Sequence, residues 1–238
     1  MLYIRTSRVT AAVISICLAA VVALAIPTAA WTAQAQAQHE KNIEYATKLL
    51  QNMRKQNDSE AMGDAIASCK GVAIFPKIIQ AGLGIGGMGG DGVVLIRGKN
   101  GWTGPSFASL MGGSIGLQIG IKEVGLVLVI TNEAGLQVFT GGQSFKLGGD
   151  VSIAAGPVGR DAEAATDSRA AASIYSYSMS KGLFAGLTLS GSTINVNGDA
   201  NKAYWGKKTD AKAALAKSAS DSKIKPLTAE LDKLSKKK

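Results

Sequence analysis

The stretch AGLGIGGMGGDGVVLIRG, residues 81–98, decides how the middle of this chain folds. It places seven glycines within residues 81–92, and Gly84, Gly86 and Gly89 match the GxGxxG pattern of dinucleotide-binding loops. Such a loop needs a helix to begin at its third glycine, so that the helix N-terminus faces the pyrophosphate. Here the chain continues into GVVLIRG, a β-branched run that favours a strand. We therefore predict no nucleotide site, and instead a strand whose glycine-rich face lets another backbone or an aromatic ring pack closely.

Similar apolar runs, separated by glycine-rich turns, extend over residues 72–196: GVAIF, SIGLQIG, GLVLVI and DVSIAAG. Short runs of this kind are typical of mostly antiparallel β-structure. The spacing of apolar residues predicts a helix over 40–55, a second from NDSE (57–60) to Gly71, and a short one within GDANKAYWG (198–206). The expected fold class is therefore α+β, with a mostly antiparallel β-sheet or barrel-like body, N-terminal helices and a short C-terminal helix.

Residues 1–37 have the pattern of an export signal. A positively charged start is followed by an apolar stretch over 9–30 and by the small-residue sequence AQAQAQ. We expect cleavage after Ala35 or Ala37, which would place the protein in the periplasm or outside the cell. The apolar stretch is long enough that a retained membrane anchor is the alternative. The remainder is expected to form one domain over 38–206.

The net charge of +9 is concentrated in a C-terminal segment, residues 207–238. This segment holds ten lysines against four acidic residues, whereas residues 39–206 hold 14 basic and 13 acidic residues. A near-neutral body whose aromatic residues are not interleaved with cations argues against a nucleic-acid partner. We predict a tail that is disordered or marginally helical. Its leucines at 227, 231 and 234 allow a basic amphipathic helix on an anionic membrane, and the alternative is a merely solubilising tail.

The residue inventory offers little for catalysis. His39 is the only histidine, and Cys69 is the only cysteine after the predicted signal. Nucleophile–histidine pairs and zinc sites are therefore not expected, and neither is any cofactor. A polar stretch supplies carboxylates that a glycosidase could use, but they alternate with arginines, which is typical of solvated ion pairs: Asp150, Asp161, Glu163 and Asp167. We expect a protein that is not an enzyme.

Several motifs follow one another in a characteristic order: GVAIFPK (71–77), AGLGIGGMGGDGVVLIR (81–97), GWTGPSF (101–107), GGSIGLQIG (112–120), FKLGGDVSIAAGPVGRDAEAATD (145–167), YSYSMSKGLFAGLTLSGS (175–192) and NKAYWG (201–206). Their order and spacing resemble the SYLF domain, from the second predicted helix to Gly206. The resemblance implies a lipid-binding module rather than an enzyme. Eukaryotic SYLF proteins bind phosphoinositides, some fungal members bind actin, and secreted bacterial relatives are described as lipid-binding.

The resemblance also implies candidate contacts for an anionic phospholipid membrane, our leading hypothesis. The first helix would insert its apolar face and present Lys41, Lys48, Arg54 and Lys55. Headgroup contacts would come from Lys77, Lys146, Arg160 and Lys181. The chain departs from the pattern at three positions, where relatives often have lysine, arginine and aspartate: Gln80, Met179 and Gly125. The alternative is an envelope structural or protein-interaction module, with an unknown protein partner and no specific lipid ligand.

Overall fold

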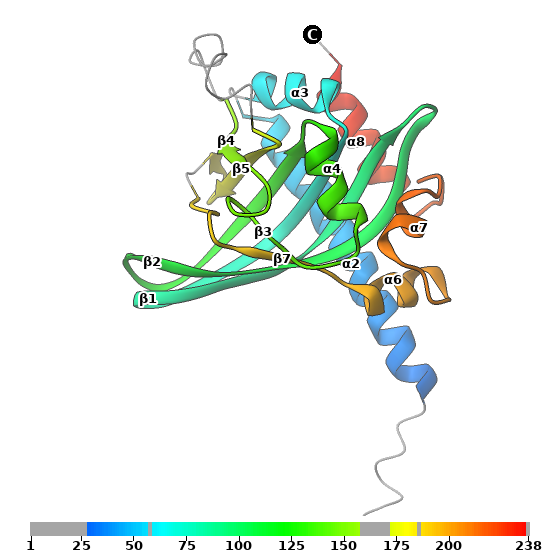
Figure 1. Cartoon of the computed structure of the whole chain (residues 1–238), viewed down its shortest axis with the longest axis horizontal. Helices are drawn as coiled ribbons and strands as arrows, with labels where there is room; N and C mark the ends of the chain where they lie inside the picture. Colours follow the sequence, from blue (N-terminus) through cyan, green and yellow to red (C-terminus); the bar gives the residue numbers. More distant parts are fainter. Residues whose placement is uncertain (1–27, 57–58, 158–171, 185–186, 237–238) are drawn as a thin grey trace, which may run out of the picture.

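The body of the protein is a curled β-sheet with helices on both faces (Figure 1). The computed structural model describes residues 28–56, 59–157, 172–184 and 187–236. Its elements, in chain order, are α2 (Thr28–Arg54), α3 (Ser59–Ser68), β1 (Gly71–Gly98), β2 (Gly101–Ile130), α4 (Glu133–Thr140), β3 (Phe145–Lys146), β4 (Ile153–Ala155), β5 (Ile174–Ser180), β6 (Leu183–Phe184), β7 (Thr193–Val196), α6 (Gly198–Trp205), α7 (Ala211–Leu215) and α8 (Lys225–Ser235). The predicted α+β class is confirmed. Residues 1–27 of the predicted signal lie outside the described residues, and the expected cleavage positions lie within α2.

One long hairpin replaces the separate short strands that the glycine-bounded runs suggested. β1 pairs antiparallel with β2 from Gly71 opposite Ile130 to Gly98 opposite Gly101. The register shifts at three irregular positions, which let these very long strands bend. The two ends of β1 come together, because the Arg97 N–H donates to the Lys70 carbonyl over 2.8 Å. The hairpin therefore curls into a half-barrel instead of extending as a ribbon (Figure 1).

Glycines make this curling sterically feasible. A Cβ atom built on Gly90 would lie 2.3 Å from the Lys77 carbonyl oxygen, and one on Gly92 would lie 2.5 Å from the Phe75 ring. Any side chain at these positions would therefore push the two halves of β1 apart. The predicted close approach of a backbone and an aromatic ring to the glycine stretch is confirmed, and the stretch that matched GxGxxG is strand throughout.

The remaining strands extend the sheet in the order β3-β7-β2-β5-β4, with β6 on β5. Every pairing is antiparallel except that of β4 with β5, as a mostly antiparallel sheet requires. Both faces of the sheet are covered: α2, α3 and α8 pack on one, and α4 on the other (Figure 1). In β1, the Ile74 side chain packs in the core beneath α2, α3 and α8, and the Phe75 side chain packs in the core on the opposite face, with α4. Because successive side chains point to opposite faces, continuous apolar runs such as GVAIF fill both cores.

Helix α4 was not predicted. Its sequence, EAGLQVFT, lies directly after a strand in the β-rich region. Asn132 caps it by accepting a hydrogen bond from the Gly135 N–H over 3.0 Å, and Phe139 is buried. The cap residue was the available signal, since asparagine favours the N-terminus of a helix.

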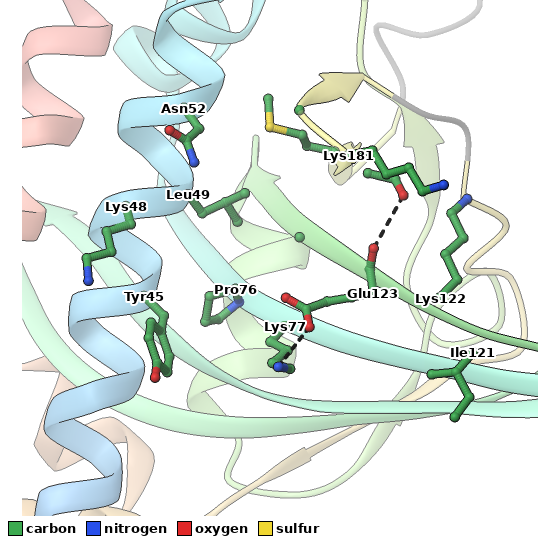
Figure 2. A pocket seen from close by; sticks show the side chains of 14 residues that line it. Tyr45, Lys48, Leu49, Asn52, Pro76, Lys77, Ile121, Lys122, Glu123 and Lys181 are labelled. Carbon is green, nitrogen blue, oxygen red and sulfur yellow. Dashed lines mark hydrogen bonds and ion pairs between the residues drawn. The ribbon is translucent and has the colours of Figure 1, made fainter.

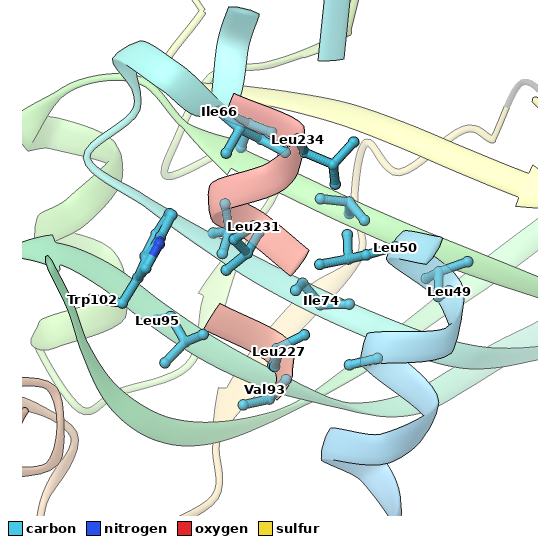
Figure 3. Close-up of a cluster of buried hydrophobic side chains, with 14 of the residues drawn as sticks. Leu49, Leu50, Ile66, Ile74, Val93, Leu95, Trp102, Leu227, Leu231 and Leu234 are labelled. Atoms are coloured by element: carbon cyan, nitrogen blue, oxygen red, sulfur yellow. The ribbon is translucent and has the colours of Figure 1, made fainter. Parts of the chain in front are cut away.

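The C-terminal segment differs most from its prediction. Residues 211–215 and 225–235 form α7 and α8, and the leucines at 227, 231 and 234 lie in the core (Figure 3). Arg54 of α2 forms an ion pair with the buried Glu230, and the Trp102 indole N–H donates to Asp232 over 2.9 Å. The segment is therefore part of the folded body and not a disordered tail. Its apolar stripe packs on the sheet and does not face outwards.

The apolar face of α2 is occupied in the same way. Ile43, Leu50 and Met53, which were expected to insert into a membrane, are buried against the sheet and α8. Among the α2 side chains that the structure describes, those of the polar, lysine-bearing face are left for a partner. None of the helices within the described ranges is both long enough and apolar enough to span a membrane.

Candidate functional site: a lysine-lined groove

A groove of about 900 Å³ lies where α2, the beginning of β1, the middle of β2 and the β5–β6 turn meet. We call it the basic groove. Its four lysines come from four segments far apart in the sequence (Figure 2): Lys48, Lys77, Lys122 and Lys181. Leu49, Ile121 and Met179 add apolar surface to the lining, and Glu123 is the one acidic side chain among the described residues that line it. Such a combination suits a ligand that has both anionic and apolar groups.

Two of the lysines are already paired within the protein. Lys48 lies 2.6 Å from Glu44, and Lys77 lies 2.8 Å from Glu123. The hydrogen bond from Lys48 lowers the pKa of the Glu44 carboxyl, and the one to Glu123 raises the pKa of Lys77. All four side chains are more than half exposed, so these pairs contribute little to stability and can exchange partners.

Lys122 and Lys181 have no such partner. Among the residues that the structure describes, no carboxylate forms an ion pair with either of them. Figure 2 shows both side chains ending on the same side of the groove. The two ammonium groups repel each other, and an anion bound between or beside them would offset that repulsion. These two lysines therefore form the anion-attracting part of the basic groove.

The backbone of Lys181 is itself unusual. Its φ of 51° is the only positive φ among the described non-glycine residues, and Gly182 follows with φ 79°. Ser180 pairs with Leu183 across this two-residue turn. Two consecutive positive φ angles are typical of the tight hairpin turn that favours asparagine before glycine. Lysine at this position is mildly strained, which marks it as a candidate functional residue.

Replacing Lys181 by asparagine is expected to raise the free energy of unfolding by about 0.5–1 kcal/mol, because asparagine tolerates this backbone conformation better. Urea unfolding measures the change. Lys99→Asn, an exposed lysine in the β1–β2 turn without a positive φ, is the matched control and is expected to leave stability unchanged. Equal changes in both variants would show that the turn is not strained.

The structure brings together three of the eight predicted site residues: Lys48, Lys77 and Lys181. Sequence reasoning missed Lys122. It lies outside the motifs that carry the family resemblance, and only the pairing of β2 with β1 places it near Lys77.

The other predicted residues lie elsewhere. Lys41 and Lys146 do not line the groove, and the backbone N–H of Lys146 donates to Asp150. Arg54 and Lys55 line a second hollow of about 610 Å³, whose lining also includes Lys233, Lys236, Glu60 and Asp64. Arg160 lies outside the described residues, as do Asp161, Glu163 and Asp167 of the alternative glycosidase hypothesis.

The three departures from the SYLF pattern fall in or beside the groove. Gly125 and Met179 both line it and are cross-strand partners, so the aspartate and arginine implied by the resemblance would face each other and neutralise one another. A Cβ atom on Gly125 would lie 2.4 Å from Leu49, which means that glycine lets α2 sit close to the sheet. Gln80 is buried and donates to the Met88 sulfur over 3.7 Å. Gly125 and Met179 therefore shape the groove without charging it.

The other ionisable groups of interest have structural partners. His39 packs on the Phe107 ring at 4.9 Å between centroids, and burial lowers its pKa. The Tyr204 hydroxyl donates to Asp221 over 2.7 Å, and burial raises the pKa of Tyr204. Within the described ranges, no group of three or more histidine, cysteine, aspartate or glutamate side chains is placed to hold a metal ion.

Comparison with known proteins gives a consistent result. The family model Ysc84, described as "Las17-binding protein actin regulator", matches residues 111–234. The "LAS seventeen-binding protein 3" of Saccharomyces cerevisiae is 36% identical over 179 residues, which cover 72% of this chain and 39% of that protein. The "SH3 domain-containing YSC84-like protein 1" of Homo sapiens is 35% identical over 141 residues, or 59% of this chain and 41% of that protein.

The chain thus spans about two fifths of the length of these relatives. The family match extends beyond Gly206, where the motif resemblance ended, and takes in α7 and most of α8. This agrees with the packing of α8 in the core. The relatives are named for binding and regulation, not for catalysis. The resemblance is confirmed, and the chain belongs to the Ysc84 (SYLF) family.

Proposed function

We propose that this chain is a binding module that holds an acidic surface of a partner protein in the basic groove. The observation that carries the proposal is the pair Lys122 and Lys181, which share one groove and have no counter-ion among the described residues. The family description as an actin regulator makes filamentous actin the first partner to test. In this proposal the chain brings surfaces together and performs no chemistry.

The groove suits a partner surface that carries several carboxylates close together. Lys122 and Lys181 would accept the first contacts, and Lys48 and Lys77 could then exchange Glu44 and Glu123 for groups on the partner. Surface ion pairs are individually weak, so affinity would come from several lysines acting together. Binding of this kind weakens as salt rises, because the charges are exposed.

Anionic phospholipid at a membrane surface is the second candidate, supported by a separate observation. Ile121 and Leu183 are 81% and 67% exposed; Ile121 lines the groove and precedes Lys122, and Leu183 follows the turn that contains Lys181. Apolar side chains next to cations are typical of peripheral membrane attachment. An exported protein, as the first 37 residues suggest, would meet such a membrane.

The two candidates are separated by one set of variants. Lys122→Gln/Lys181→Gln in the full chain is expected to lower affinity at least about tenfold, since each lysine near an anionic surface contributes on the order of 1 kcal/mol. Co-sedimentation is measured with filamentous actin and with vesicles of phosphatidylcholine, with or without phosphatidylglycerol. Lys99→Gln/Lys208→Gln removes the same charge from two exposed lysines outside the groove and should bind like the unmodified chain.

Loss of actin binding alone would support the protein-binding proposal, and loss of binding to anionic vesicles alone would support the lipid candidate. Equal losses in the groove variant and in the control variant would contradict both, because binding would then follow total charge and not the groove.

A further inference from the structure

The outer edge of β2 is interrupted next to the basic groove. One edge of β2 pairs with β1 from Gly101 to Ile130, apart from short breaks in register, one of them at residues 116–118. The other edge pairs with β7 at 108–111 and with β5 at 125–130. Over 112–124, this second edge has no strand partner within the described parts of the chain. A gap therefore lies between β5 and β7, and the register break at 116–118 divides it into residues 112–115 and residues 119–124.

The backbone in this gap points outwards at identifiable positions. The Ser180 hydroxyl donates to the Glu123 carbonyl over 3.3 Å, which shows that the main-chain groups of Glu123 face away from β1. Peptide groups alternate in direction along a strand, so those of Ile121 face the same way. Main-chain donors and acceptors on an open edge form a template for another strand.

The surroundings of this edge are open and basic. Ile121 is 81% exposed, and a Cβ atom on Gly113 or Gly120 would meet no atom within 4 Å. Lys122 lies on the edge itself, and Lys181 lies in the turn at which β5 stops. A segment continuing the line of β5 would therefore lie near two unpaired ammonium groups.

We propose that an extended acidic segment of a partner protein docks here as an added strand along β2, in line with β5. Its main chain bonds to the N–H and carbonyl of Ile121 and to the N–H of Glu123, whose carbonyl already accepts from Ser180, and its carboxylates meet Lys122 and Lys181. Main-chain bonds of this kind supply affinity while side chains supply specificity. The inference rests on the proposed function and specifies how the acidic partner binds.

A membrane surface uses this edge poorly. Lipid headgroups carry phosphate acceptors but cannot form a ladder with alternating donors and acceptors. An extended peptide satisfies both kinds of main-chain group and also the lysines. The combination of an open edge and unpaired cations therefore favours a peptide over a lipid.

A labelled peptide of about seven residues, alternating valine and glutamate, is a suitable probe, since natural strands have similar lengths. Fluorescence anisotropy with the full chain is expected to show saturable binding. The same peptide with alternate residues N-methylated is expected to bind at least about tenfold more weakly, because it lacks the donors for the ladder. Hydrogen exchange at the amides of Ile121 and Glu123 is expected to slow when the unmodified peptide binds.

Ile121→Pro removes one outward-facing N–H and leaves the bonds to β1 in place, and it is expected to weaken peptide binding at least about tenfold. Ile121→Thr keeps that N–H and a β-branched side chain, so it is expected to retain binding. The N-methylated peptide gives an independent answer should the proline variant fold poorly.

Three results would overturn the inference. Equal binding of the unmodified and the N-methylated peptide, or unchanged hydrogen exchange at the amides of Ile121 and Glu123, would show that the strand edge is not used. This holds even if Lys122→Gln/Lys181→Gln lowers binding. The proposed function would then survive without strand addition. No binding of the unmodified peptide would also reject it. If the lysine variant instead bound actin and peptide normally, the proposed function itself would fail.

Discussion

Removing residues 207–238 is expected to abolish cooperative folding. This segment contributes Leu215, Ile224, Leu227 and Leu231 to the interior, each at most 1% exposed. Burying such a side chain contributes about 1.5–3 kcal/mol, so the four together contribute about 6–12 kcal/mol. The free energy of unfolding of a whole domain is about 5–15 kcal/mol. The truncated chain should therefore lack a sigmoidal urea transition followed by circular dichroism.

Two controls make this result interpretable. Leu231→Ala in the full chain should cost about 2–5 kcal/mol, because it leaves a cavity between α8 and the sheet. Removing only residues 236–238 should leave the transition unchanged, since the helix ends at Ser235. A truncated chain that unfolds at the same urea concentration and with the same slope would mean that the segment contributes nothing to the core.

Gly90→Ala is expected to destabilise the chain by about 3 kcal/mol or more, at or above the upper end of the usual cost of overpacking, because the new methyl group meets backbone atoms. The new methyl group would begin 2.3 Å from the Lys77 carbonyl oxygen, and both groups belong to β1. The clash can be relieved only if the two halves of β1 separate, which opens the curl of the sheet. Urea unfolding at constant pH measures the loss.

The neighbouring glycine provides the control. A Cβ atom on Gly89 would lie 3.5 Å from the Leu110 carbonyl oxygen, which is ordinary contact. Gly89→Ala is therefore expected to be neutral, or stabilising by up to about 1 kcal/mol through the reduced freedom of the unfolded chain. Similar losses in the two variants would show that backbone contact across the curl does not govern the outcome.

Much of the fold could be predicted from local patterns. The absence of a helix after Gly89 excluded a nucleotide loop, and β-branched runs between glycines predicted strands. Strand length was predicted poorly, because glycine has two roles that look alike in a sequence. It can end a strand at a turn, or it can stand inside a strand where another backbone packs closely. β1 and β2 each contain many such glycines. The helix capped by Asn132 was missed because its mixture of glycine and apolar residues resembles that of the neighbouring strands.

The candidate site was predicted only in part, for a related reason. Motif resemblance pointed to Lys48, Lys77 and Lys181, but also to lysines that the fold places elsewhere. Lys122 belongs to the groove only because β2 runs antiparallel to β1. Which lysines already have carboxylate partners is likewise a property of the folded chain, since Lys77 and its partner Glu123 lie on different strands.

The sequence by itself determined the α+β class, the β-rich character of its middle region, the family and the need for close backbone packing at the glycine stretch. These follow from steric and periodic properties that neighbouring residues carry with them. Only the tertiary structure decided that the apolar stripe of residues 225–235 meets the sheet and not a membrane. The hydrophobic effect has no direction, so an amphipathic helix has the same pattern whichever apolar surface covers it. The basic groove likewise exists only after folding, because its four lysines come from four separate segments.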